Sequence, residues 1–185
     1  MVGYYIAAKI QSLELEEKPV VGVVATTLCD GRDPMVMRGL NRFEWMAPIV
    51  FPILNALPDS LMKMRLPIRW VSKMDKIAND KALARVVIND QLGGGNWVPI
   101  HFLHSILTNV PEVEPEAFRL CPVLLAHPER DQMTPLELSL SFFHKLSAEK
   151  QLVVLKDAGH IPNEEPGWSE LDLAIENFVR DKVQL

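Results

Sequence analysis

The sequence predicts an α/β protein in which parallel strands alternate with helices and a helical region interrupts the alternation. Three observations support this prediction. Short runs rich in β-branched and apolar residues occur at residues 20–28, 121–127 and 151–155. Segments with apolar residues at helical spacing separate or follow these runs. Between residues 35 and about 108, in contrast, no segment has a convincing strand pattern.

The first 34 residues predict a helix, a strand and a turn. Residues 2–15 place apolar side chains on one helical face and polar ones elsewhere, and Pro19 is expected to end this helix. The run from Val20 to Leu28 is apolar on both alternating faces, which is typical of a strand buried in a parallel sheet. The polar residues 30–34 then favour a turn.

Residues 35–110 are interpreted as an inserted helical cap. The expected helices cover residues 35–57, 59–64, 67–89 and 98–107. We expect the triple glycine at 93–95 to be a flexible joint, because no strand precedes it and no Lys-Ser/Thr pair follows, as a phosphate-binding loop requires. Methionine and aromatic side chains are frequent in this region. They fit core packing and the lining of an apolar pocket equally well.

The alternation of strands and helices resumes after a linker rich in proline and glutamate at residues 111–116. The expected elements are a buried strand at 121–127, a helix at 135–147, a strand at 151–155 and a closing helix at 166–182. We therefore predict one α/β unit made of residues 1–34 and 111–185, with residues 35–110 as its cap.

Composition limits the classes of partner. The chain has 185 residues, 48% of them hydrophobic and 23% charged, which is enough apolar material for a core. A formal net charge of -5 and the lack of a dense Lys/Arg cluster argue against nucleic-acid binding. No apolar run reaches the ~18 residues of a membrane span, and the start has no signal-peptide pattern, so we expect a cytoplasmic protein. Cys29 and Cys121 are interpreted as small buried hydrophobes.

Two predicted loops carry side chains suited to catalysis. Asp131 follows the strand at 121–127, and His160 follows the strand at 151–155. In a parallel sheet such loops meet at the carboxyl ends of the strands. A carboxylate there can accept a hydrogen bond from one imidazole nitrogen and stabilise the imidazolium that forms when the other nitrogen takes a proton. Asp131 and His160 are therefore the predicted catalytic residues.

The sequences around these two residues resemble a known family. P-V-L-L-A-H-P-E-R-D-Q-M-T-P at 122–135 and L-K-D-A-G-H-I-P-N-E-E-P-G at 155–167 resemble the end of an α/β-hydrolase. More narrowly, they are similar to bacterial serine hydrolases of the monoglyceride lipase, lysophospholipase and serine aminopeptidase group. The resemblance implies a Ser-Asp-His chain order, with Asp131 as acid and His160 as base. It also implies a partial α/β-hydrolase fold with an inserted cap, and chemistry that needs no cofactor or metal.

The chain departs from the family pattern at the nucleophile. No G-x-S-x-G motif occurs in the sequence, and residues 1–9 resemble the helix that follows such a turn. We therefore expect the C-terminal part of a serine-type hydrolase that cleaves an ester, thioester or amide of an apolar substrate through an acyl-enzyme. Without a nucleophile and an oxyanion hole, the polypeptide alone is expected to be inactive.

Several other residues compete for a role in the site. Asp30 ends the first predicted strand and is a rival acid for His160. His101 and His104 share a helical face, but the spacing supplies no third zinc ligand. The residues with weaker claims are two histidines interpreted as strand-end and surface residues, His127 and His144, and three serines in helical patterns that suit a nucleophile poorly, Ser105, Ser139 and Ser141.

A non-catalytic function is the alternative. In an α/β sheet without preceding strands, the strand from Val20 to Leu28 would be an unpaired apolar edge. Such an edge favours pairing with another chain or self-association. The alternative is therefore an interaction module that pairs through this edge, and the sequence leaves substrate identity and oligomeric state open.

Overall fold

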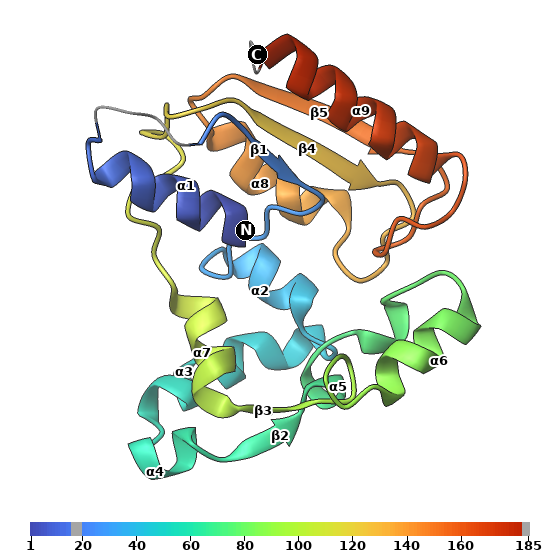
Figure 1. The fold of residues 1–185 in the computed structure, drawn as a ribbon. Coiled ribbons are helices and arrows are strands. Elements are labelled where there is room, and N and C mark those ends of the chain that lie inside the picture. The colour runs from blue at the N-terminus through green and yellow to red at the C-terminus, as the bar shows by residue number, and fades with distance from the viewer. Residues whose placement is uncertain (16–19, 183–185) are drawn as a thin grey trace.

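The computed structural model describes residues 1–15 and 20–182. Its centre is a parallel three-stranded sheet in the order β1-β4-β5, formed by β1 (Val23–Ala25), β4 (Val123–Pro128) and β5 (Lys150–Leu155). Val24 of β1 pairs with Leu124 of β4, which places β4 between the other two strands (Figure 1). All six residues of β4 are buried. The predicted α/β class with a parallel sheet is therefore confirmed.

Helices cover both faces of the sheet. The α1 helix (Val2–Ser12) and the α8 helix (Leu136–Lys145) share a buried cluster with Val123 and Leu125 of β4. The α9 helix (Gly167–Lys182) packs against the alternate β4 residues in a second cluster. Because successive residues of a strand point to opposite faces, α9 lies on the face opposite α8. Apolar residues on both faces of β4 thus account for its complete burial.

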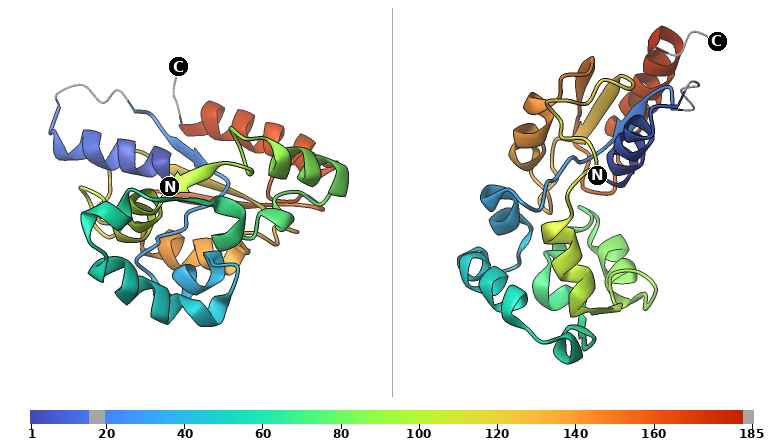
Figure 2. Two further views of the ribbon diagram at one scale, coloured as in Figure 1. Left: turned by 90° about the horizontal axis from the view of Figure 1, so that it is seen from below. Right: turned by 90° about the vertical axis from the view of Figure 1, so that its left-hand side faces the viewer.

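The segment from residue 34 to 108 forms a separate group of short elements, called here the helical region. It lies beyond one end of the sheet in Figure 1 and in the right-hand view of Figure 2. Its elements are α2 (Pro34–Leu40), the 3-10 turn η1 (Glu44–Met46), α3 (Ala47–Ala56), α4 (Asp59–Met62), β2 (Arg65–Pro67), α5 (Ile68–Val71), the 3-10 turn η2 (Met74–Lys76), α6 (Lys81–Asn89), β3 (Trp97–Pro99) and α7 (Ile100–Thr108).

The long helices predicted in this region are broken into shorter ones. Asn41 is extended and ends α2, so the expected helix over 35–57 becomes two helices joined by η1. Asp80 accepts hydrogen bonds from the N–H groups of Ala82 and Leu83 and begins α6 inside the expected helix over 67–89. An aspartate with extended backbone is a strong helix start, and this local signal overrides the apolar periodicity.

The expectation of no strand between residues 35 and 108 is wrong. β2 and β3 pair antiparallel, with Leu66 opposite Val98. Each strand has three residues, and the last residue is a proline, Pro67 in β2 and Pro99 in β3. Proline has no backbone N–H to donate to a neighbouring strand, so its presence argues against a strand in the sequence. Neither strand is long enough to show a period-two pattern.

Two further expectations need correction. β1 covers Val23–Ala25 and not the whole run from Val20 to Leu28, because only these three residues pair with β4. The glycines at 93–95 form a hydrogen-bonded turn and not a flexible joint, since all three N–H groups donate to carbonyls of residues 87 and 90.

The first helix is also shorter than expected. α1 ends at Ser12, before the predicted end near Leu15, and the chain then turns through Leu13 and Glu14. The prediction that Pro19 ends this helix lies outside the described residues. In the described part of the chain, no helix is long and apolar enough to cross a membrane.

Candidate functional site

The loops that follow β4 and β5 are joined by backbone hydrogen bonds. The N–H of Glu129 donates to the carbonyl of Leu155 at 2.9 Å, and the N–H of Arg130 donates to the carbonyl of Ala158 at 2.9 Å. Arg130 also forms an ion pair with Asp157. β4 and β5 are parallel neighbours, so both loops leave the same edge of the sheet. These bonds fix one loop against the other.

The joined loops bring Asp131 and His160 together. The Nδ1 atom of His160 lies 2.9 Å from Oδ2 of Asp131. The Asp131 side chain is fully buried, whereas the imidazole of His160 remains 23% exposed. The hydroxyl of Thr134 completes the group, at 2.7 Å from Oδ2 of Asp131 and 3.1 Å from Nδ1 of His160.

The surroundings of Asp131 favour its ionised form. Its Oδ1 atom accepts hydrogen bonds from the N–H groups of Met133 and Thr134 at 2.9 and 2.8 Å. Burial alone would raise the pKa of this carboxyl, but the hydrogen bonds from His160, the Thr134 N–H and the Thr134 hydroxyl outweigh it and hold the pKa below its usual value. Asp131 is therefore a buried anion at neutral pH.

The buried anion determines how His160 holds its proton. An ionised carboxylate can only accept, so Nδ1 of His160 must carry the hydrogen that lies between it and Asp131. The Thr134 hydroxyl has a single hydrogen, which goes to Asp131, and its oxygen receives a share of the Nδ1–H. In a neutral imidazole, Nε2 then carries the lone pair. That atom can accept a proton from an incoming group.

Part of the helical region packs over this site. Met133 and Ile161, which neighbour the two site residues in sequence, pack against a buried cluster that includes Met74 and Ile77. A Cβ atom at Gly159 would meet the side-chain amide of Asn79 at 2.9 Å, so the His160 loop and the residues after η2 are in close contact. The helical region therefore contacts both loops of the site.

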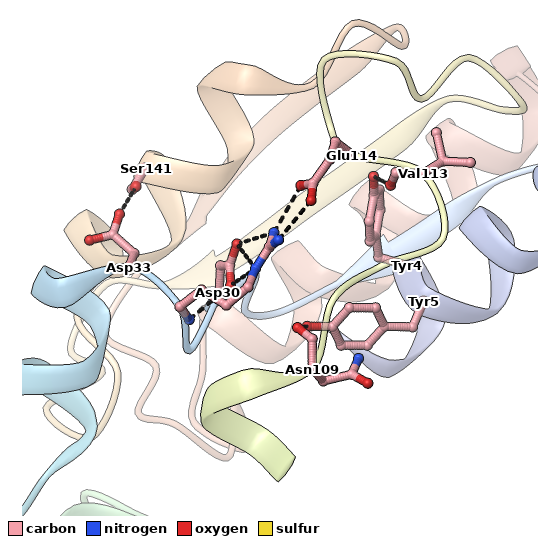
Figure 3. A network of polar contacts seen from close by, with 9 residues as sticks. Tyr4, Tyr5, Asp30, Asp33, Asn109, Val113, Glu114 and Ser141 are labelled. Carbon is pink, nitrogen blue, oxygen red and sulfur yellow. Dashed lines mark hydrogen bonds and ion pairs between the residues drawn. The ribbon is translucent and has the colours of Figure 1, made fainter. Parts of the chain in front are cut away.

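Asp30, the rival acid, belongs to a different group of charges. Its carboxylate accepts hydrogen bonds from Arg32, whose Nη2 lies 2.7 Å from Oδ2, and Arg32 also binds Glu114 (Figure 3). Within the described residues, no hydrogen bond joins Asp30 to His160. Glu114 lies in the linker after α7, so these ion pairs join the turn that follows β1 to that linker.

The other candidates also have different partners. The hydroxyl of Ser139 accepts a hydrogen bond from the N–H of Leu28, and Ser141 donates to Asp33. Ser105 donates to a carbonyl within α7. The described residues thus include no hydrogen bond between any of these serines and His160. His104 lies 2.7 Å from the amide oxygen of Asn55, and no group of three metal-ligating side chains occurs in the described part.

Both cysteines are free thiols with buried surroundings. Burial is the main cause that raises the pKa of Cys29 to about 11, and burial also raises the pKa of Cys121 to about 11. Both thiols therefore stay protonated at neutral pH, which makes them poor nucleophiles.

Thr134 is a site residue that the sequence reasoning missed, and the complete burial of His127, expected only as a strand-end residue, is a second feature that it missed. Thr134 follows the acid by three positions, a spacing at which a loop aspartate commonly receives hydrogen bonds from the backbone. His127 is fully buried at the end of β4, with Nδ1 at 2.9 Å from the carbonyl oxygen of Thr26. Its Nε2 atom has no partner among the described residues. The continuous apolar run before His127 was the available signal for its burial.

No protein-family model matches the chain, and no curated protein matches it. Solved structures do. A monoacylglycerol lipase of Paleococcus ferrophilus matches with a TM-score of 0.60 and 18% identity over 95% of this chain and 64% of the lipase. A soluble variant of the Saccharomyces cerevisiae monoglyceride lipase, in complex with a substrate analogue, matches with a TM-score of 0.65 and 13% identity over 96% and 61%.

A third structure, DcsB in complex with its substrate analogue, matches with a TM-score of 0.52 and 16% identity over 96% of this chain and 61% of DcsB. In all three cases nearly the whole chain aligns, while it spans less than two thirds of the other protein. The parallel sheet, the flanking helices and the helical region therefore belong together in one known architecture. The chain has part of an α/β-hydrolase fold.

Proposed function

We propose that this chain supplies the acid and the base of a serine-type hydrolase that cleaves an ester, thioester or amide of a small apolar substrate. The observation that carries the proposal is the contact between Nδ1 of His160 and the buried, ionised carboxylate of Asp131. This contact leaves Nε2 as the proton acceptor. Thr134 acts as a positioning residue, because its hydroxyl touches both partners.

In the proposed reaction, Nε2 of His160 takes the proton of an attacking hydroxyl and later gives it to the leaving group. The imidazolium formed between these steps is stabilised by Asp131. The sequence contains no G-x-S-x-G motif to present the hydroxyl. We therefore propose that the nucleophile comes from residues outside these 185, and that this polypeptide alone has no acyl-enzyme turnover.

The test compares this chain with a version extended by the codons that precede Met1 in its reading frame, with p-nitrophenyl butyrate as substrate. We expect activity in the extended chain only, with kcat lowered by about 10³-fold or more in His160→Gln and by a factor of up to about 10⁴ in Asp131→Asn. Asp30→Asn is the matched control and is expected to keep kcat within about threefold. Turnover by this chain that survives His160→Gln would disprove the proposal, as would an extended chain without turnover.

Thr134 offers a finer test in the same extended chain. Thr134→Val removes the hydroxyl and keeps the shape, so we expect kcat to fall by about tenfold with little change in KM, because the effect concerns the imidazole and not substrate binding. Thr134→Ser restores the hydroxyl and should restore most of the rate. Equal losses in both variants would indicate a packing role only.

A second candidate function is an interaction module, favoured by the position of β1. This strand lies at the edge of the sheet, and its Val24 side chain is 41% exposed. An apolar edge strand offers unpaired backbone groups to another chain. If the edge binds a second copy, Val24→Lys should convert a dimer into a monomer in light scattering, whereas Val154→Lys on the opposite edge should not. A monomeric parent chain would count against this candidate.

A further inference from the structure

A hollow in the helical region has a positively charged lining, although the protein as a whole is negatively charged. Its volume is about 430 Å³, and Arg42, Arg69, Asp75 and two aromatic residues are among those that line it. A second hollow of about 400 Å³ shares Arg42 and Asp75 and adds Lys73 and Lys76. The two hollows together have four cationic residues and one acidic residue in their lining, in a chain with a formal net charge of -5.

Two of the four cations have acidic partners and two do not. Arg42 forms an ion pair with Asp75 at 3.0 Å, and Lys73 forms one with Glu44 at 3.0 Å. For Arg69 and Lys76, no ion pair occurs within residues 1–15 and 20–182. Arg42 also donates a hydrogen bond to the Arg69 carbonyl, which holds the two arginine residues together. The two hollows thus have positive charge that no acidic side chain of the described residues neutralises, from Arg69 in the first and Lys76 in the second.

Apolar surface lies beside this charge. Phe43 and Trp70 line the first hollow and are 50% and 61% exposed, respectively, and Met74 and Ile88 complete its apolar lining. Exposed aromatic side chains in a concave surface are typical of a ligand site, because their burial on binding releases water from apolar area. A ligand that fits both features has an anionic group and an apolar part.

A third hollow lies between this region and the loops that carry the proposed catalytic residues. Its volume is about 510 Å³, and it shares Asp75 and Lys76 with the second hollow. Gln132, next to Asp131, lines both, and Glu164 from the His160 loop lines the third. Cationic and acidic residues balance in this third lining, so the positive excess lies on the side toward Arg69.

From this arrangement we propose that the hollows between Arg69 and Gln132 bind an anionic amphiphile, a molecule with a phosphate or carboxylate group and an apolar chain. The inference deepens the proposed function, on which it rests, by narrowing the substrate class to esters whose apolar chain also carries an anionic group. Arg69 and Lys76 bind the anion, Phe43 and Trp70 pack against the apolar part, and the ester extends past Gln132.

Binding can be measured on this chain without catalysis. Decyl phosphate and decanoate are titrated below their micelle concentrations at low salt, with the fluorescence of the four tryptophans and calorimetry as readouts, beside neutral monodecanoylglycerol and cationic decyltrimethylammonium. We expect the two anions to bind at least about tenfold more tightly than the neutral and cationic amphiphiles, and added salt to weaken them. A stronger signal for one anion identifies the head group.

Variants locate the site. Arg69→Gln and Lys76→Gln should each weaken anion binding by about fivefold to tenfold, while Lys63→Gln, at the end of α4 on the far side of the helical region, should leave it unchanged (Figure 1). Equal binding of neutral and anionic amphiphiles, or an equal loss in Lys63→Gln, would overturn the inference. His160→Gln should keep full binding, so a failure here is distinguishable from a failure of the proposed catalysis.

Discussion

The sheet unit, which comprises residues 1–15, 20–33 and 109–182 of the described chain, differs from the helical region in how its apolar residues are used. Among the described residues, the sheet unit has buried apolar clusters of twelve and six residues, and its aromatic side chains Tyr4, Phe118 and Phe142 are packed ring to ring. The helical region has a buried cluster of four residues there, which includes Met74 and Ile77 and is completed by residues of the site loops. Many of its large apolar side chains are exposed.

This difference indicates that the two regions gain stability in different ways. Burial of apolar area stabilises the sheet unit by itself, whereas the helical region depends on helix caps, short pairings and contact with the sheet unit. A weakly packed region next to an imidazole can change shape around a ligand at low energetic cost. The following predictions test the contrast, from the largest expected effect to the smallest.

The largest effect is expected from a matched pair of phenylalanines. Phe142→Ala removes a fully buried ring that contacts Tyr4 at 4.8 Å between centroids, and should lower the free energy of unfolding by about 3–5 kcal/mol. Phe102→Ala removes a ring of the helical region that is 44% exposed, and should cost less than about 1 kcal/mol. Urea denaturation measures both, and equal losses would refute the contrast.

Contact between the regions is tested at Gly31. A Cβ atom there would lie 2.4 Å from the carbonyl oxygen of Ile106 and 2.9 Å from Cα of Leu107, and backbone atoms of α7 cannot move aside locally. Gly31→Ala should therefore cost about 1–3 kcal/mol and make the helical region more sensitive to limited proteolysis.

The control for this experiment is Gly3→Ala in α1, where the nearest atom would be 3.8 Å away. Alanine favours a helix over glycine, so this change should leave stability unchanged or raise it by up to about 1 kcal/mol. Cleavage confined to the sheet unit in Gly31→Ala would show that α7 is not the contact that matters.

The buried His127 should make the sheet unit sensitive to pH. Burial lowers the pKa of His127, although Asp131 and the hydrogen bond to Thr26 oppose this effect. Below the pKa of about 6.5 that histidine has in the unfolded chain, the unfolded chain binds a proton and the folded chain does not. The free energy of unfolding is therefore highest above that pH and decreases as the pH falls toward the pKa of His127 in the folded chain. The slope is at most about 1.4 kcal/mol per pH unit.

Urea midpoints between pH 7.5 and 5 measure this slope in the parent chain and in His127→Gln. The variant should lose part of the pH dependence, whereas His101→Gln, an exposed position in the helical region, should keep it. An unchanged slope in His127→Gln would show that this imidazole is not the group responsible.

The smallest effect concerns a helix cap in the helical region. Asp80 accepts a 2.6 Å hydrogen bond from the N–H of Ala82 at the start of α6. Asp80→Ala should cost about 1 kcal/mol and shift the thermal unfolding of the helical region, with Asp80→Asn keeping most of the stability. A loss as large as that of Phe142→Ala would mean that the two regions unfold as one unit.

The same contrast explains how much of the fold was predictable. The strand at 121–127 and the helices at 135–147 and 166–182 were located within a few residues of β4, α8 and α9, because long apolar patterns specify buried elements. The short helices and the β2–β3 pair depend on single caps and on contacts between distant residues. The spacing of apolar residues along the sequence reveals neither a single cap nor a contact between distant residues.

The site also has a part that the sequence predicts and a part that it does not. The loop rule for parallel sheets was sufficient to pair Asp131 with His160 as a hypothesis, and their catalytic roles remain a prediction. The side-chain hydrogen bonds of Thr134 and His127 could not be predicted, since they depend on where a loop turns and on which carbonyl a buried imidazole meets. The assignment of residues 35–110 as a cap also remains a prediction.

The position of β4 between two partner strands has a consequence for motion. All of its residues are buried, and residues 123–125 have a strand on each side, so their amides should exchange with deuterium only when the whole sheet opens, whereas the largely exposed β5 should exchange earlier. Asp131 therefore follows the strand that is expected to open last, and His160 follows one that is expected to open earlier. A local opening of β5 would break the contact between the imidazole and the carboxylate while β4 stays closed.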